Sequence, residues 1–208
     1  GRQMFDKNTL RYMHKELFAE AIKQYQQRLP LLANADPSPS SAQTPRRRER
    51  PVSVYIRVRP LFDKDVEENG DFDIISPMDK QLILHSCLFE ADLKTPFIQH
   101  LLFKFDHVFG HSASSKTVYK AVAEDMVRGS CSGGIGTIFM FGQTGSGKTH
   151  TMTAIESMAA QDLFRHLPPP ADDLPTISIQ FLELRGDRCF DLLSRATPQK
   201  GKDFPELR

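Results

Sequence analysis

The feature that most constrains this chain is a glycine-rich motif at residues 142–149, which reads Gly-Gln-Thr-Gly-Ser-Gly-Lys-Thr. It fits the phosphate-loop pattern G-x-x-x-x-G-K-[ST] in full. Glycines let the backbone turn sharply and bring its N–H groups against phosphate oxygens with no Cβ in the way. Such a loop connects a strand to a helix, so the motif predicts an α/β fold.

The neighbouring sequence supplies the context that this motif requires. Residues 135–141 are almost wholly apolar, which is typical of a short central strand buried on both faces. The helix expected after the loop adds a partial positive charge at its N-terminus, where phosphates would bind. These features together predict a nucleotide site, and a glycine-rich turn that matches by chance is the alternative.

Each loop residue has a predicted role. Lys148 would place a positive charge on the β- and γ-phosphates, and the Thr149 hydroxyl would bind Mg²⁺. Lys148 and Thr149 are therefore the candidate catalytic residues, and Thr149 is the candidate metal ligand. The residues predicted to contact the nucleotide are Gly142, Gln143, Thr144, Gly145, Ser146, Gly147, Lys148 and Thr149.

Length and composition predict one domain with an extension. The chain has 208 residues, of which 39% are hydrophobic, and no apolar run approaches the roughly 18 to 20 residues of a membrane span. The N-terminus is polar and shows no secretory signal. Three cysteines, Cys87, Cys131 and Cys189, have neither metal-ligand nor disulfide spacing, so we expect reduced thiols in a cytosolic protein.

Charge is distributed unevenly along the chain. Residues 1–50 carry ten Lys or Arg against five Asp or Glu, a balance of +5, and residues 51–208 have a balance of −4. A basic extension indicates contact with a polyanion, which could be nucleic acid, an anionic membrane or an acidic protein lattice. A solvated tail is the alternative.

The extension contains one predicted helix. Apolar residues from Leu10 to Leu29 recur at spacings of three and four and form a stripe that indicates an amphipathic helix over residues 9–29, ended by Pro30. The stripe consists of Leu10, Met13, Leu17, Ala21, Tyr25 and Leu29, widened by Phe18 and Ile22. We expect it to dock on the same molecule or on a partner, with a membrane surface as the alternative.

Residues 33–51 are rich in Pro and Ser and predict a flexible linker. Their basic run, residues 46–50, could be a nuclear localisation signal, a polyanion contact or a spacer. The remaining predicted elements are a strand at 52–58, a loop at 63–73, a strand at 81–85, an extended segment at 101–109, a helix from Ser114 or Ser115 to about Arg128 that stops at Gly129, a helix at 156–167 and a strand near 177–184 followed by a loop at Gly186.

Four segments in order resemble the kinesin motor domain. Residues 141–152, Phe-Gly-Gln-Thr-Gly-Ser-Gly-Lys-Thr-His-Thr-Met, are similar to the kinesin phosphate loop. Residues 57–60, Arg-Val-Arg-Pro, resemble the Arg-x-Arg-Pro element that lies beside the adenine in that family. Residues 105–109, Phe-Asp-His-Val-Phe, resemble its Phe-Asp-x-Val-Phe strand. Phe-Leu-Glu-Leu at 181–184 and Phe-Asp-Leu-Leu at 190–193 resemble a later segment.

The resemblance implies both fold and site. It implies a P-loop NTPase-type three-layer sandwich with a central mixed sheet, in which residues 51–208 are the N-terminal part of the motor domain and residues 1–50 a basic, neck-like helix and linker. It places Arg57, Arg59 and Pro60 in the adenine pocket with His150 nearby.

The resemblance also implies an activity. It implies a microtubule-dependent ATPase that binds ATP or ADP with Mg²⁺ and has tubulin or microtubules as its partner, with neither nucleic acid nor membrane. Dimerisation through regions outside the motor is compatible with it. The expected location is the cytoplasm and the microtubule cytoskeleton, including the spindle.

Within this family, the chain is most similar to the depolymerising, internal-motor class, the thirteenth. That class has a basic neck and a long insertion with a Lys-Val-Asp tip. Here 44 residues separate Pro60 from Phe105, and Glu90-Ala91-Asp92 stands where the tip is expected. Residues 158–164 also resemble that class. We expect residues 62–104 to form a hairpin arm ending near the tip, and a variable surface loop is the alternative.

Two departures from the family bear on activity. About ten residues that usually separate the phosphate loop from the next helix are missing between Met152 and Met158. The two switch motifs and the main microtubule-binding helices have no match in these residues, so we expect the 208 residues alone to bind nucleotide poorly and hydrolyse it hardly at all. The alternatives are a translocating kinesin, a non-motile nucleotide-binding protein of microtubules, or an unrelated P-loop enzyme such as a nucleotide kinase.

Overall fold

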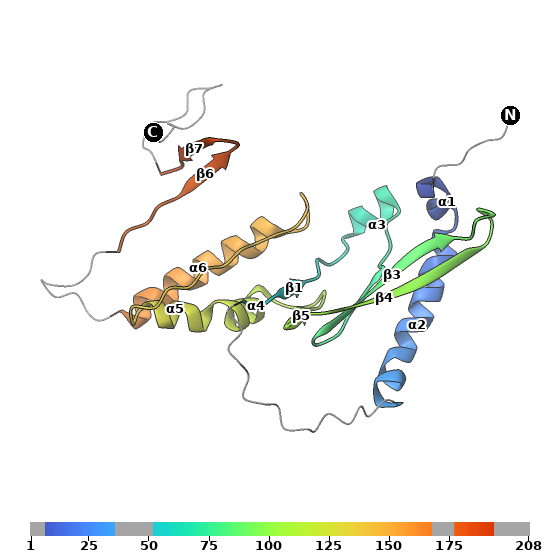
Figure 1. Ribbon diagram of the computed structural model, residues 1–208, viewed down its shortest axis with the longest axis horizontal. Helices are drawn as coiled ribbons and strands as arrows, with labels where there is room; N and C mark the ends of the chain where they lie inside the picture. The colour runs from blue at the N-terminus through green and yellow to red at the C-terminus, as the bar shows by residue number, and fades with distance from the viewer. Residues whose placement is uncertain (1–6, 36–51, 168–176, 194–208) are drawn as a thin grey trace, which may run out of the picture. The chain divides into compact units, whose positions relative to one another are not determined.

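The computed structural model describes residues 7–35, 52–167 and 177–193, and the chain divides into two units, residues 1–167 and 168–208 (Figure 1). The first unit contains, in chain order, α1 (Lys7–Met13), α2 (Lys15–Ala35), β1 (Tyr55–Arg57), α3 (Asp63–Asn69), β2 (Ile75–Pro77), β3 (Gln81–Phe89), β4 (Pro96–Lys104), β5 (His107–Phe109), α4 (Ser115–Val122), α5 (Glu124–Ser130) and α6 (Lys148–His166). The second contains β6 (Leu182–Arg185) and β7 (Arg188–Asp191).

The fold is mixed α/β, with parallel and antiparallel strand pairs, as expected for a P-loop NTPase-type domain. β1 pairs with β5 in parallel, and β2, β3 and β4 form an antiparallel sheet in that order. β6 and β7 form an antiparallel hairpin. These are three separate small sheets in the described residues, rather than one central sheet.

The N-terminal helix is longer than predicted. A turn at His14 separates α1 from α2, and α2 continues through Pro30 to Ala35. The prediction that Pro30 ends the helix is wrong. A proline removes one helical hydrogen bond and costs about 3 kcal/mol, and the leucine and alanine residues that flank Pro30 favour continuation of the helix. The predicted linker is therefore helical at residues 33–35, and its remainder, with the basic run, lies outside the described residues.

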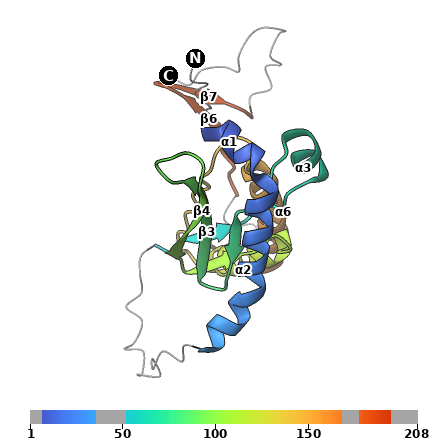
Figure 2. The ribbon, with the colours of Figure 1, turned by 90° about the vertical axis from the view of Figure 1, so that its right-hand side faces the viewer.

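Helix α2 docks on the β3–β4 hairpin of the same molecule, one of the two predicted outcomes (Figure 2). Phe18 and Ile22, each only 1% exposed, form an apolar cluster with Cys87 of β3. Leu17, at the centre of the predicted stripe, is 56% exposed. The buried face is thus the edge of the predicted stripe that carries Phe18 and Ile22, and the opposite edge, with Leu17, is left exposed.

The insertion after β1 forms the predicted hairpin arm. β3 and β4 pair over nine residues, from Gln81 opposite Lys104 to Phe89 opposite Pro96. The connecting residues 90–95 include Glu90, Ala91 and Asp92, so these three lie at the tip as expected. The predicted strand at 81–85 extends to Phe89 because the alternating apolar pattern continues on its buried face.

A second apolar cluster joins the helices that follow β5. Phe109 of β5, Val118 and Tyr119 of α4 and Ile155 of α6 are buried together with Ala123, which lies between α4 and α5. Ser114 caps α4 as predicted, because its hydroxyl accepts a hydrogen bond from the Thr117 N–H at 3.1 Å. The predicted single helix to Arg128 is divided at Ala123 into α4 and α5, and α5 passes through Gly129 to end at Ser130.

Two sequence predictions are wrong in this unit. Residues 135–141 form no strand, and Ile135 and Phe141 are each 99% exposed. A central strand requires hydrogen-bonding neighbours on both sides, and no described strand pairs with this segment. Residues 63–69, predicted as a loop, form α3, because the Asp65 carboxylate accepts from the Phe62 N–H at 3.0 Å and Gly70 ends the helix with φ of 67°.

The second unit contains a short hairpin in its described residues. Arg185 pairs with Arg188 across a two-residue turn at Gly186 and Asp187, which agrees with the predicted loop. The strand predicted near 177–184 begins only at Leu182. Phe190 on β7 is 2% exposed.

Candidate nucleotide-binding site

Helix α6 begins at Lys148, directly at the end of the glycine-rich motif. Gly147 is its N-cap and has φ of 91°, a left-handed conformation that glycine adopts without strain. The helix is continuous over 19 residues, Lys148–His166. The chain therefore spans residues 152–158 as helix with no loop, which is consistent with the missing residues noted from the sequence.

The loop folds tightly on itself before this helix. The Ser146 N–H donates to the Gln143 carbonyl oxygen at 3.1 Å. At Gly142, an added Cβ would lie 2.6 Å from Ser146 Oγ, so a larger residue would require the Ser146 side chain to move. The motif thus has the compact backbone that lets successive N–H groups surround an anion.

Lys148 folds its ammonium group back onto the loop. Its Nζ donates to the carbonyl oxygens of Gly142 and Gln143, each at 2.7 Å. Thr149 is exposed in the first turn of α6, so its hydroxyl is accessible from solvent. The triphosphate of a nucleotide fits this arrangement, which combines the Lys148 ammonium, the N-terminus of the 19-residue helix α6 and the glycine-rich loop. The accessible Thr149 hydroxyl beside them is a suitable ligand for Mg²⁺.

Arg57 connects the end of β1 to the helix behind the loop. Its guanidinium donates to Thr151 Oγ1 at 2.9 Å and to Ser115 Oγ and the Ala113 carbonyl oxygen, each at 3.2 Å. Thr151 is 7% exposed and donates its own hydroxyl to the Gly147 carbonyl oxygen at 3.2 Å. Arg57 is therefore linked to helix α6 by its hydrogen bond to the buried Thr151.

Sequence reasoning assigned Thr151 no role. The available signal was its position four residues after Gly147, where a threonine hydroxyl can bond back to the preceding turn.

Arg59 points its guanidinium at the start of α3. It forms an ion pair with Asp65 at 2.9 Å and lies 4.6 Å from the centre of the Phe62 ring. The backbone N–H of Phe62 and then the Arg59 side chain hold the pKa of Asp65 below its usual value. Sequence reasoning missed Asp65.

The adenine contacts predicted for Arg57, Arg59, Pro60 and His150 stay predictions. Pro60 and His150 are exposed in the structure.

The base of α6 is joined to α4 by a hydrogen bond from Tyr119. Its hydroxyl donates to Asp162 at 2.7 Å, and burial, together with this carboxylate, raises the pKa of Tyr119 to about 12.

In the described ranges no three His, Cys, Asp or Glu side chains lie close enough together to form a metal site. None of the helices in those ranges has the length and apolar character needed to cross a bilayer.

Comparisons with known proteins agree on one family. A model of the kinesin motor domain matches residues 57–206. Diatom spindle kinesin-1 of Cylindrotheca fusiformis is 35% identical over 143 residues, which are 68% of this chain and 23% of that protein. Kinesin-like protein KIF24 is 34% identical over 152 residues in Mus musculus and over 165 in Homo sapiens, with 69% and 75% of this chain covered.

This chain spans only a small part of those relatives. It covers 23% of the diatom protein and 11% and 12% of the mouse and human KIF24 proteins.

Proposed function

This chain belongs to the kinesin motor family, and from that premise we propose that it is part of an ATP-dependent microtubule motor. The observation that carries the proposal is the phosphate loop at the N-terminus of α6, with Lys148 held inside it. The experiment that tests it is ATP turnover with and without microtubules, for the intact motor and its Lys148→Ala variant. ATP turnover that microtubules do not stimulate would instead favour a non-motile nucleotide-binding protein or another P-loop enzyme.

The loop residues bind the phosphates in this proposal. Backbone N–H groups of the loop donate to phosphate oxygens, except that of Ser146, which bonds the Gln143 carbonyl oxygen. Lys148 exchanges its two carbonyl acceptors for phosphate oxygens, to which a cation bonds more strongly. Thr149 offers its hydroxyl as the chain's ligand to Mg²⁺. Bound Mg²⁺ supplies positive charge that offsets the charge developing on the transferred phosphoryl group.

Arg57 acts as a positioning residue rather than through contact with phosphate. Its bonds to Thr151 and Ser115 hold the starts of α6 and α4 together, so the loop has a fixed anchor at its helical end. Arg57, Arg59 and Pro60, with His150 nearby, are proposed as the adenine-facing group from their place in the kinesin pattern. For Arg59 this role requires that its ion pair with Asp65 be shared or broken.

We further propose that the motor is a microtubule depolymerase. The support is the β3–β4 hairpin, which extends nine residue pairs and ends in Glu90, Ala91 and Asp92, together with its resemblance to the class with a projecting tip. A depolymerase must stabilise a curved tubulin end, and a projecting arm can make contacts that differ between curved and straight lattices. A translocating kinesin is the alternative, and shortening of stabilised microtubules distinguishes the two.

The remaining proposals concern organisation and place. Residues 1–50 act as a neck-like extension and residues 51–208 as motor domain, a division supported by the family match that begins at residue 57. Tubulin and microtubules are the proposed partners, and any dimer would form through regions outside the motor domain. The microtubule cytoskeleton is the proposed location, and the name of the relative, diatom spindle kinesin-1, supports the spindle as one site.

A further inference from the structure

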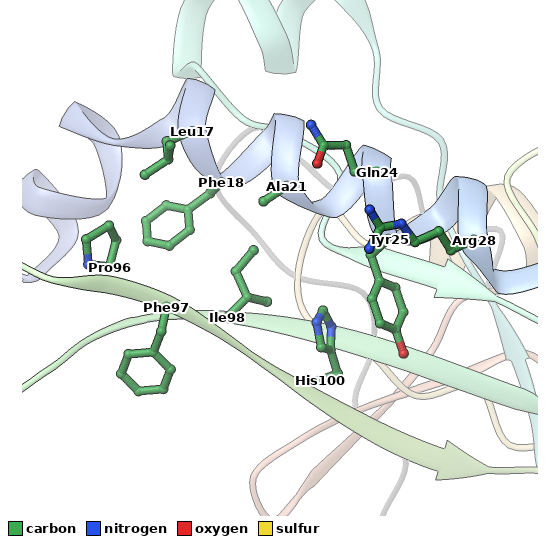
Figure 3. A pocket seen from close by; sticks show the side chains of 10 residues that line it. All are labelled: Leu17, Phe18, Ala21, Gln24, Tyr25, Arg28, Pro96, Phe97, Ile98 and His100. Atoms are coloured by element: carbon green, nitrogen blue, oxygen red, sulfur yellow. The ribbon is translucent and has the colours of Figure 1, made fainter. Parts of the chain in front are cut away.

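A groove of about 340 Å³ runs between helix α2 and strand β4 (Figure 3). Its floor includes Ile98 and His100 of β4, and the stacked rings of Tyr25 and His100 close it on the side of the buried core. Its helical wall is the row Leu17, Ala21, Gln24 and Arg28. This row includes the part of the predicted apolar stripe that the packing of α2 on the hairpin leaves uncovered.

The strand beneath this groove has a free edge. β4 is the outer strand of the β2-β3-β4 sheet in the part of the chain that the structure describes. At the two ends of the ladder, Glu90 bonds to Thr95 and Phe105 bonds to Lys80, which sets the alternation of hydrogen bonds between β3 and β4. By that alternation Ile98, His100 and Leu102 direct their backbone N–H and C=O groups away from β3.

The free backbone groups and the groove belong to the same residues. Ile98 and His100 line the groove with their side chains and present their peptide groups at the open edge. A strand added along this edge would therefore place every second side chain beside α2. An open edge next to an apolar wall is the arrangement by which domains bind extended peptides.

The groove changes character along its length. One end is apolar, where Leu17, 56% exposed, lies near Pro96. At the other end Arg28 is the single formally charged lining residue, and no described carboxylate forms an ion pair with it. This guanidinium is therefore available to a carboxylate on the molecule that fills the groove.

We propose that this groove binds an extended peptide of a partner protein, which adds a strand to β4 and places apolar side chains along α2 and a carboxylate on Arg28. Leu17 and Arg28 are eleven residues apart on the helix, or roughly 16 Å at about 1.5 Å per residue. An extended chain covers that distance in about five residues. Because only alternate side chains share a face, the peptide carries two apolar residues two apart, and an acidic residue two further on.

A synthetic peptide tests this directly. Fluorescein-labelled Ser-Val-Ser-Val-Ser-Glu-Ser is titrated with the 208-residue chain, and binding is followed by fluorescence anisotropy. We expect saturable binding that Arg28→Glu weakens about tenfold or more, because it replaces a charge-assisted bond with repulsion. The peptide with Lys in place of Glu should reverse that preference. N-methylation of the two peptide amides that face β4 should abolish binding, with the protein itself unchanged.

The matched control is Lys23→Glu, which makes the same charge change on an exposed part of α2 outside the groove. It should bind the acidic peptide as the unaltered chain does, and circular dichroism should show equal helix content in both variants. The proposal is overturned by no saturable binding up to about 1 mM, by equal losses in the two variants, or by binding that tolerates N-methylation. Self-association of the chain through β4 that the peptide does not displace would also overturn it.

Discussion

His85 and His100 lie directly opposite each other on β3 and β4, with their Nδ1 atoms 2.7 Å apart. His85 is fully buried, and its Nε2 lies 2.7 Å from Ser76 Oγ. Tyr25 of α2 stacks on His100 with ring centres 3.9 Å apart. One proton shared between the two Nδ1 atoms satisfies this pair, so full protonation of both rings would break the hydrogen bond beneath the Tyr25 ring.

The histidine pair predicts that stability falls as the pH is lowered below about 6.5. Burial lowers the pKa of both histidines, and the neighbouring His100 lowers that of His85 further. In this range the unfolded chain binds protons that the folded chain does not. The free energy of unfolding is therefore greatest above the pKa that the histidines have in the unfolded chain, and it decreases as the pH falls below that value. Urea denaturation of the chain between about pH 5 and 8 measures this.

Matched variants identify the source of that pH dependence. His100→Asn keeps a hydrogen-bonding group near His85 Nδ1 but cannot titrate, so it should reduce the pH dependence, with buried His85 left as the one titrating ring of the pair. His166→Asn, at an exposed histidine on α6, should leave it unaltered. Equal slopes for His100→Asn and the unaltered chain would show that the pair does not cause the effect.

Thr149→Ala should weaken nucleotide binding in Mg²⁺ more than in EDTA. The hydroxyl is proposed to act on the metal, so its removal matters only when the metal is present. Titration of the intact motor with a fluorescent ADP analogue under both conditions measures the difference. Thr149→Ser, which keeps the hydroxyl, is the control. Equal losses in the two conditions would mean that Thr149 serves only the helix start.

The hairpin tip should be needed for microtubule shortening and not for basal ATP turnover. Asp92 caps the tip turn, accepting hydrogen bonds from the Lys94 N–H at 2.8 Å and the Thr95 N–H at 3.0 Å, and these bonds lower its pKa. Glu90→Ala/Asp92→Ala removes both tip carboxylates and loosens the turn. We expect nearly unchanged basal turnover and strongly reduced shortening of stabilised microtubules by the intact motor.

The control for the tip is Glu67→Ala/Glu68→Ala, which removes the same charge from exposed positions on α3. It should shorten microtubules at the parent rate. Shortening that survives the tip change, or a parent motor that glides along microtubules without shortening them, would contradict the depolymerase proposal.

Short-range signals were sufficient to predict several parts of this structure. The glycine-rich motif predicted the start of a helix at the end of the loop, and Ser114 was identified as a cap because capping depends on a few neighbouring residues. The β3–β4 hairpin and its tip were predicted from the resemblance to the depolymerising class together with the length of the insertion.

Features that depend on distant partners could not be predicted in this way. Residues 135–141 have the composition of a buried strand, but a strand requires neighbours, and the described residues provide none. The apolar stripe of α2 was identified, yet whether Leu17 or Phe18 faces inward is decided by the hairpin it meets. The side-chain hydrogen bonds of Arg57 to Thr151 and of His85 to His100 join residues that are not neighbours in sequence, so no local pattern indicates them.

The most direct test of the account is ATP turnover by the intact motor with Lys148→Ala, measured at saturating microtubules beside Lys120→Ala, a control at an exposed lysine on α4. Lys148 is the cation that the loop holds through Gly142 and Gln143, and electrostatic stabilisation dominates phosphoryl transfer. The account predicts a loss of at least about a hundredfold for Lys148→Ala and parent-level turnover for the control. Turnover within about tenfold of the parent, a change of only roughly 1.4 kcal/mol in barrier height, would contradict it.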